Sequence, residues 1–217
     1  MNSANTGYGR LLQEEDLRKI YSIMSTHRID TFVRTLEEKK GKNVGKILPF
    51  VRGLRFSSLL IYTIRKLLKG SHLTANWGHL IDSNGLYCSR ECDIIIHRPD
   101  GEWQRWNGDG AEDGHVMDFR FIEQDAAKAV ISCKSFLRKA DIEVDYCSEM
   151  KKYVNEVWLF AECCQNGFSS RIQTAATDIG YNNFWHLYSW SKANGMTDPN
   201  NEHWNDFIQK VKALKTN

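Results

Sequence analysis

The chain has 217 residues and a formal net charge of +2; 41% of its residues are hydrophobic and 26% are charged. This length and balance predict one sizeable folded domain and argue against disorder over most of the chain. Because the net charge is close to zero, the protein surface is not positively charged as a whole. Any positively charged surface that binds nucleic acid must therefore be local.

The first part of the chain has a helical pattern. In the first forty residues, apolar side chains recur at three- and four-residue steps, and residues 41–45 form a polar break. From Pro49 a second helix is predicted, which Gly70 ends. Its apolar side is formed by Leu59, Leu60, Ile64, Leu67 and Leu68. We therefore expect an N-terminal helical extension over residues 1–48 and the main domain over residues 49–217.

From residue 76 onward the pattern changes to strands. A hairpin turn at residues 83–85 joins the first two predicted strands, and a loop covers residues 100–114. The predicted strands are 76–82, 86–98, 128–136, 156–164 and 183–190; the predicted helices are 141–154, 169–180 and 200–215. A hairpin followed by alternating helices and strands indicates an α/β fold, with a mixed sheet flanked by helices.

The chain shows neither a membrane helix nor a secretory signal. Its longest apolar run, residues 59–68, contains Arg65 and Lys66, and the first ten residues lack the apolar region of a signal peptide. We expect a cytoplasmic protein without a membrane partner, in which the six cysteines are reduced. Cys88 and Cys92 resemble half of a zinc site, but no second pair completes it, so core thiols are favoured.

Two charged residues stand at the ends of predicted strands. Asp93 comes directly before the apolar run 94–96, and Lys134 lies near the end of the third strand. If these strands pair, both side chains reach one edge of the sheet. A carboxylate there can hold Mg²⁺, and a lysine can orient a water near a phosphate. Each residue also has a purely structural interpretation: a turn hydrogen bond for Asp93, and a side chain extended to water for Lys134.

The segments CDIII and AVISCKS, within residues 56–164, resemble the PD-(D/E)xK nuclease superfamily. The resemblance implies a restriction endonuclease-like core, built from a helix, a three-strand meander, a helix and a further strand. It also implies that Asp93 is the first metal-binding acid, that Lys134 is the motif lysine and that the main-chain carbonyl of Cys133 is a metal ligand.

The chain departs from the superfamily at Ser132, where the second metal-binding acid would stand. A hydroxyl cannot replace a carboxylate, because the charge at the metal falls by one. Some restriction endonucleases of the superfamily carry Ser-x-Lys and take the missing glutamate from the following helix. Glu149, fifteen residues after Lys134, is the corresponding candidate here. Its competitors are Glu123, Glu143 and Asp145.

Two further groups of residues are candidates for the site. Glu91 lies two residues before Asp93 on the same side of the strand, so it either joins the metal site or holds Arg90 or Lys134. Trp103, Arg105 and Trp106 combine rings with a charge, which suits base stacking and phosphate contact. The same pattern suits a loop that folds over its own core.

Together these features predict a metal-dependent endonuclease that acts on DNA in restriction or anti-phage defence. The expected catalytic residues are Asp93, Lys134 and Glu149, with Mg²⁺ as cofactor and Mn²⁺ as its substitute. One catalytic centre per chain favours a homodimer for cutting both strands. The alternative is a degenerate nuclease fold that binds nucleic acid or a protein partner without catalysis. Ser132 supports this alternative, because it stands in place of the second metal-binding acid. The chain has no GxGxxG, GxxxxGK[ST] or GxSxG signature of a small-molecule enzyme.

Overall fold

The computed structural model describes residues 47–84, 87–102, 119–138, 141–165, 169–191, 195–196 and 199–216. Its helices are α4 (Ile47–Leu67), α6 (Val144–Met150), α7 (Ser169–Ile179) and α8 (Asn201–Ala213). Its strands are β1 (Thr74–Ile81), β2 (Cys92–His97), β3 (Phe119–Glu123), β4 (Ala127–Leu137), β5 (Glu156–Gln165), β6 (Asn183–Ser191) and β7 (Gly195–Met196). Within these residues, no helix is long and apolar enough to cross a membrane.

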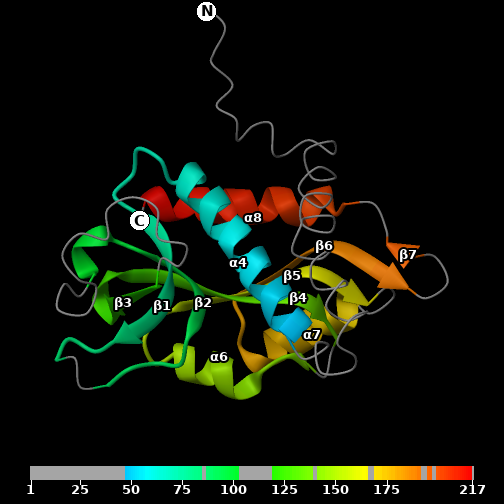
Figure 1. The fold of residues 1–217 in the computed structure, drawn as a ribbon, viewed down its shortest axis with the longest axis horizontal. Helices are drawn as coiled ribbons and strands as arrows, with labels where there is room; N and C mark the ends of the chain where they lie inside the picture. Colours follow the sequence, from blue (N-terminus) through cyan, green and yellow to red (C-terminus); the bar gives the residue numbers. More distant parts are fainter. Residues whose placement is uncertain are drawn as a thin grey trace, which may run out of the picture.

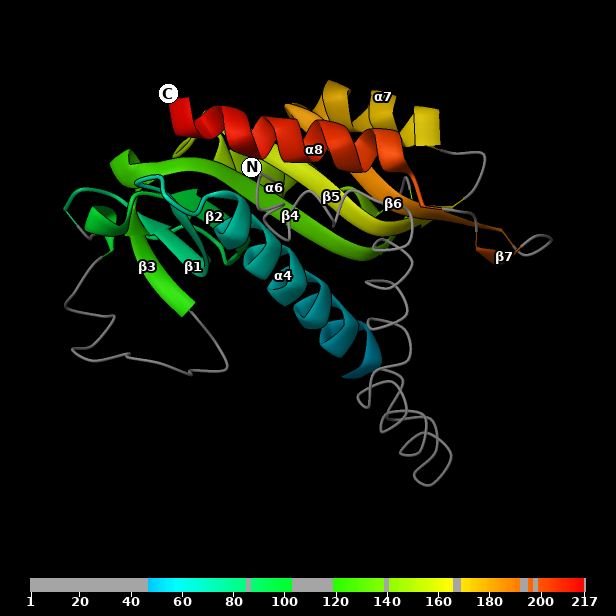
Figure 2. The same ribbon diagram turned by 90° about the horizontal axis from the view of Figure 1, so that it is seen from above.

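In the described residues the strands form one mixed sheet of seven, in the order β3-β1-β2-β4-β5-β6-β7. Strand β2 is antiparallel to both β1 and β4, and β7 is antiparallel to β6; the other neighbours are parallel. Figures 1 and 2 show β3 at one end of the sheet and β7 at the other. The central strand β5 is buried along almost its whole length, as expected for a strand covered by helices on both faces.

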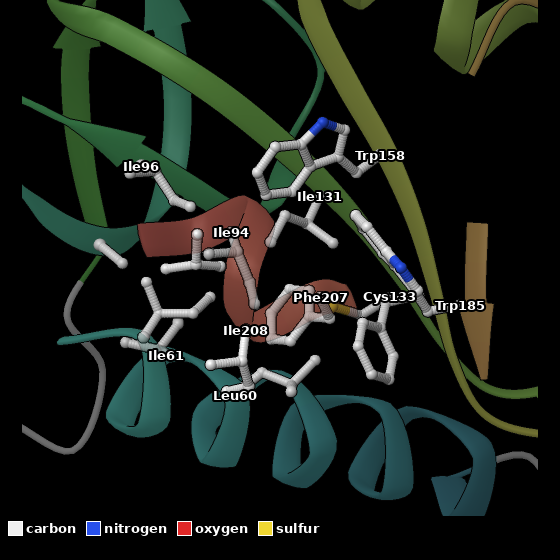
Figure 3. Close-up of a cluster of buried hydrophobic side chains, with 14 of the residues drawn as sticks. Leu60, Ile61, Ile94, Ile96, Ile131, Cys133, Trp158, Trp185, Phe207 and Ile208 are labelled. Atoms are coloured by element: carbon white, nitrogen blue, oxygen red, sulfur yellow. The ribbon is translucent and has the colours of Figure 1, made fainter. Parts of the chain in front are cut away.

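One face of the sheet is covered by α4 and α8. The buried stripe of α4 includes Phe56, Leu60 and Ile64, and the helix ends shortly before Gly70, whose φ of 81° favours glycine. Helix α8 adds Phe207, whose ring centroid lies 4.7 Å from that of Phe160. Figure 3 shows Leu60 of α4 and Phe207 of α8 among the side chains of the strands, such as Ile94 and Ile131. This face holds the larger part of the aromatic core.

The opposite face is covered by α6 and α7. Tyr146, Cys147 and Met150 of α6 pack on this face together with Ile172 and Ala176 of α7. The strands contribute alternate residues to the two faces, because successive side chains point in opposite directions. The result is a helix–sheet–helix arrangement, and the expected α/β fold is confirmed.

The described elements agree with most of the sequence predictions, with four differences. The second strand begins at Cys92 and not at residue 86, since Cys88 forms only an isolated bridge with Ile81. The helix predicted over 141–154 is shorter, and two strands, β3 and β7, were not predicted. The helical extension up to residue 46 and the residues 103–118 lie outside the described residues.

Strand β3 requires a glycine on its neighbour β1. Gly78 lies at an irregularity in the pairing of β1 with β2, and it is aligned with Arg120 of β3. A Cβ atom at Gly78 would lie 1.7 Å from the main-chain oxygen of Arg120. Only a residue without a side chain therefore lets β3 approach β1 at this point.

Candidate active site

Asp93 lies where the regular pairing of β2 with β4 ends. The register runs from His97↔Ala127 to Ile94↔Ile131, and its continuation places Asp93 opposite Ser132. Beyond Ile94 the carboxylate of Asp93 replaces a main-chain acceptor: its Oδ2 accepts a hydrogen bond of 2.7 Å from the N–H of Cys133. The side chain of Asp93 is thus fixed on the neighbouring strand.

Strand alternation places the candidate residues on one face of the sheet. Ile95 and Val130 are paired across β2 and β4, and both belong to the core beneath α6 and α7. Asp93 lies two residues from Ile95, and Ser132 and Lys134 lie two and four residues from Val130. All three therefore share the face covered by α6 and α7. The expectation that Asp93 and Lys134 converge agrees with the structure.

The acid beside Lys134 is Glu143. The Nζ of Lys134 forms an ion pair with Oε1 of Glu143, and the two side chains are 23% and 49% exposed. Glu143 is the residue that precedes α6, at the N-cap position, but its side chain makes no capping hydrogen bond. The carboxylate is therefore available to turn toward β4. Asp93, Lys134 and Glu143 bring together β2, β4 and the start of α6.

Burial dominates the electrostatic environment of Asp93. Burial raises the pKa of Asp93 from 3.8 to about 6, while the Cys133 N–H and the charge of Lys134 act to lower it. The carboxylates of Glu91 and Glu143 are close enough to raise this pKa further. Asp93 and Glu143 thus lie beside the ammonium group of Lys134, and Glu91 adds negative charge near Asp93. Carboxylate oxygens are ligands that a hard divalent cation takes.

Glu91 is held by an aromatic residue. Its Oε1 accepts a hydrogen bond of 2.7 Å from the indole N–H of Trp77 on β1. Glu91, directly before β2, therefore contributes charge near Asp93 while its carboxylate is held by Trp77 of the neighbouring strand β1. Its partner is neither Arg90 nor Lys134, the two residues that the sequence suggested.

The structure places Glu149 away from Lys134. Its carboxylate accepts a hydrogen bond of 2.9 Å from the main-chain N–H of Arg90 and forms an ion pair of 2.8 Å with the Arg90 guanidinium. Six residues of chain, and about 9 Å of helical rise, separate it from Glu143. The structure therefore brings Glu143, which the sequence offered only as a competitor, to Lys134, and it pairs the predicted acid Glu149 with Arg90. Glu149 instead fixes the segment that leads into β2.

Two buried tyrosines, Tyr146 and Tyr181, lie on the same face of the sheet as the candidate residues, and no pattern in the sequence marked either one for function. Tyr181 is buried, and its hydroxyl donates a hydrogen bond of 3.2 Å to the main-chain oxygen of Glu143. Tyr146 is also buried; its hydroxyl lies against the Cys92 thiol and makes no hydrogen bond of ordinary geometry within the described residues. Ser132, only 2% exposed, lies close enough to Tyr181 to lower the pKa of that tyrosine.

The cysteines do not form a zinc site in the described residues. All six are free thiols; Cys92 is buried, as expected of a core thiol, whereas Cys88 is exposed, contrary to that expectation. Burial raises the pKa of Cys92 to about 12, which disfavours the thiolate that zinc requires. Over the described ranges, no group of three or more His, Cys, Asp or Glu side chains forms a metal cage. Trp103, Arg105 and Trp106 lie outside the described residues.

Comparisons with known proteins identify the fold. No protein-family model and no curated protein matches the sequence. Among solved structures, the chain is similar to cAAA-bound NucC of P. aeruginosa ATCC27853, with 12% identity, a TM-score of 0.57 and coverage of 98% of this chain and 92% of that chain. It is also similar to cAAA-bound NucC of E. coli MS115-1, with 8% identity, a TM-score of 0.54 and coverage of 92% and 90%. The chain therefore has a restriction endonuclease-like α/β fold, matching the nuclease-like fold of NucC.

Proposed function

We propose that the protein is a metal-dependent endonuclease that hydrolyses phosphodiester bonds in DNA, in restriction or anti-phage defence. One observation carries the proposal: Asp93, Lys134 and Glu143 lie on one face of the sheet, at the point where β2 and β4 stop pairing. The likeness of the fold to the NucC structures supports it. DNA as the substrate and a defence role are part of the proposal.

In this proposal, two carboxylates hold the metal. Asp93 and Glu143 supply oxygen ligands, and the main-chain carbonyl of Cys133 is a third donor in the superfamily that the sequence resembles. Bound Mg²⁺ would polarise the phosphate and offset the charge that develops during hydrolysis. The hydrogen bond from the Cys133 N–H orients the Asp93 carboxylate for this role. Burial disfavours the ionised form of Asp93, and a bound cation would offset this cost.

Lys134 positions the attacking water. Its ammonium group carries three N–H donors, of which the ion pair with Glu143 occupies one. The remaining donors are available to hold a water in line with the phosphorus and to contact a non-bridging phosphate oxygen. Glu143 thus has two functions, because it binds the metal and keeps the lysine beside it. Cutting both strands of a duplex would require two such centres, which favours a homodimer.

The experiment is a cleavage assay on supercoiled plasmid, with Mg²⁺ or with EDTA. Asp93→Asn, Lys134→Met and Glu143→Gln are each expected to reduce metal-dependent cleavage at least about 100-fold, as is typical when a metal ligand or a charge-stabilising group is removed. Glu149→Gln is the matched control: it removes the same charge from a carboxylate paired with Arg90, and cleavage within a few-fold of wild type is expected. The Asp93→Asn protein, purified in the same way, also reveals any contaminating nuclease.

Three outcomes would contradict these assignments. Cleavage that is retained in EDTA would refute the metal dependence. Cleavage that Glu143→Gln leaves intact and Glu149→Gln abolishes would return the role of second acid to Glu149. A wild-type protein that shifts DNA in a gel without cutting it would support the alternative, a degenerate nuclease fold that binds without catalysis. The serine at position 132 is the observation that favours this alternative.

A further inference from the structure

Tyr181 makes a connection that the proposed chemistry does not use. It lies 38 residues after Glu143 in the chain, yet its hydroxyl donates a hydrogen bond to the Glu143 main-chain oxygen. The ring is only 3% exposed, and burial raises the pKa of Tyr181 well above its ordinary value. The phenol therefore stays protonated and remains a hydrogen-bond donor at any physiological pH.

The main chain of Tyr181 is fixed on both sides. Gly180, with a φ of 111°, ends α7, and the N–H of Tyr181 then donates a bond of 3.0 Å to the oxygen of Ala176, as in a Schellman motif. The next residue, Asn182, donates its N–H to the Val157 oxygen at 2.9 Å, and its side-chain oxygen accepts from the Val157 N–H at 2.8 Å. Tyr181 is thus joined both to α7 and to the central strand β5.

Glu143, in contrast, has weak local support. It precedes α6, which has only seven residues, and a helix this short depends on tertiary contacts for its stability. The Glu143 oxygen accepts the first hydrogen bond of that helix from Cys147 at 3.4 Å, which is long for such a bond. The bond of 3.2 Å from Tyr181 is the shorter of the two bonds to this oxygen.

Ser132 completes the connection from the strand side. Ser132 is 2% exposed and lies on the face of β4 that α6 and α7 cover, the face on which Tyr181 also packs. Its side chain is close enough to the phenol of Tyr181 to lower the pKa of that tyrosine. A series of contacts therefore runs from β4 through Tyr181 to the residue that carries the second acid.

We propose that Tyr181 is a positioning residue for Glu143, and that Ser132 anchors Tyr181 in this role. Ser132, which stands where the superfamily motif has an acid, would then still contribute to the site. It supplies no metal ligand, but it holds in place the acid that replaces one. This inference rests on the proposed metal-binding role of Asp93 and Glu143.

The test is Tyr181→Phe, which removes the hydroxyl and leaves the ring in place. Mn²⁺ binding is measured by calorimetry on the metal-free protein without DNA, and the Mg²⁺ concentration at half-maximal cleavage is measured separately. Metal binding is expected to weaken about tenfold, the lower part of the range for residues that orient a metal ligand. At saturating metal, cleavage should recover to within a few-fold of wild type. Ser132→Ala should produce a smaller change in the same direction.

Tyr146→Phe is the matched control. It also removes a buried phenol hydroxyl beneath the same face of the sheet, but one that donates no ordinary hydrogen bond within the described residues. Its metal affinity should equal that of wild type. This comparison separates positioning of Glu143 from a general effect of losing a hydroxyl in this layer, and thermal melting of each variant reports any loss of folding.

The inference is overturned if both Tyr181→Phe and Ser132→Ala bind Mn²⁺ with wild-type affinity, or if Tyr146→Phe weakens binding as much as Tyr181→Phe does. If Tyr181→Phe fails to fold, Ser132→Ala alone decides. A wild-type protein that binds Mn²⁺ and cuts no DNA would remove the proposed nuclease activity but leave this binding test in force. A wild-type protein that binds no Mn²⁺ would end both.

Discussion

Replacing Asp93 by asparagine should stabilise the metal-free protein while it abolishes cleavage. The carboxamide oxygen can still accept the hydrogen bond from Cys133, so the contact with β4 is kept. The variant loses only the ability to ionise. Any pH-dependent difference in stability between the two proteins therefore reports the charge of Asp93.

The magnitude follows from the raised pKa of Asp93. An increase from 3.8 to about 6 corresponds to about 3 kcal/mol of folding free energy, since one pKa unit equals about 1.4 kcal/mol. Part of the side chain reaches solvent, so we expect about 2 kcal/mol after screening. Because the folded-state pKa is raised, this contribution to stability is fully present below pH 3.8 and is lost as the pH rises through about 6.

The assay is urea denaturation of both proteins in EDTA, at a series of pH values between about 4 and about 8. The free energy of unfolding of Asp93→Asn, minus that of wild type, should rise by about 2 kcal/mol across this range. Burial lowers the pKa values of His97 and His186 to about 4, so these histidines increase stability as the pH rises. They are present in both proteins, and the subtraction removes their effect.

A difference that does not change with pH would refute the reasoning, because Asp93 would then carry no ionisation cost.

A second experiment adds Mg²⁺ at neutral pH. At ten times its dissociation constant, a ligand of the folded state stabilises wild type by about 1.4 kcal/mol. The Asp93→Asn variant should gain much less. Equal stabilisation of both proteins would place the metal elsewhere.

Three other substitutions test separate parts of the structure. Glu149→Gln should cost no more than about 1 kcal/mol, because its ion pair with Arg90 is partly exposed; a larger loss in urea denaturation would show that this contact does more than hold the segment before β2. Gly78→Ala should cost at least about 2 kcal/mol, because a Cβ there collides with the Arg120 oxygen and the strands must shift; an unchanged melting temperature would contradict the close packing of β1 and β3. Tyr146→Phe should be neutral or stabilising by up to about 1 kcal/mol, because its buried hydroxyl makes no ordinary hydrogen bond within the described residues; a clear loss of stability would reveal a partner.

The sequence was most informative where one physical pattern dominated. Helix α4 was predicted because its apolar residues recur at helical spacing, and β2 and β4 because isoleucine, valine and alanine form continuous apolar runs. The convergence of Asp93 with Lys134 followed from their positions in two strands that were expected to pair. Local patterns therefore determined both the core and the first two residues of the candidate site.

Other features depend on contacts that no local pattern records. Strand β3 has five residues and follows a polar segment; its place at the edge of the sheet depends on Gly78 of β1. The choice between Glu143 and Glu149 depends on where α6 begins. The sequence predicted a helix from residue 141, whereas α6 begins at Val144, so Glu143 lies beside β4 and Glu149 reaches Arg90. Tyr181 gave no signal, because a tyrosine after a helix is usually part of the core.

The most direct test of the metal centre is anomalous diffraction from crystals soaked in Mn²⁺. We expect one peak between Asp93 and Glu143, about 2.0–2.3 Å from a carboxylate oxygen of each residue, as for oxygen-ligated divalent cations. A peak at Glu149, or a fully occupied Mn²⁺ site elsewhere with none at Asp93, would contradict the assignment of these two acids as the metal ligands.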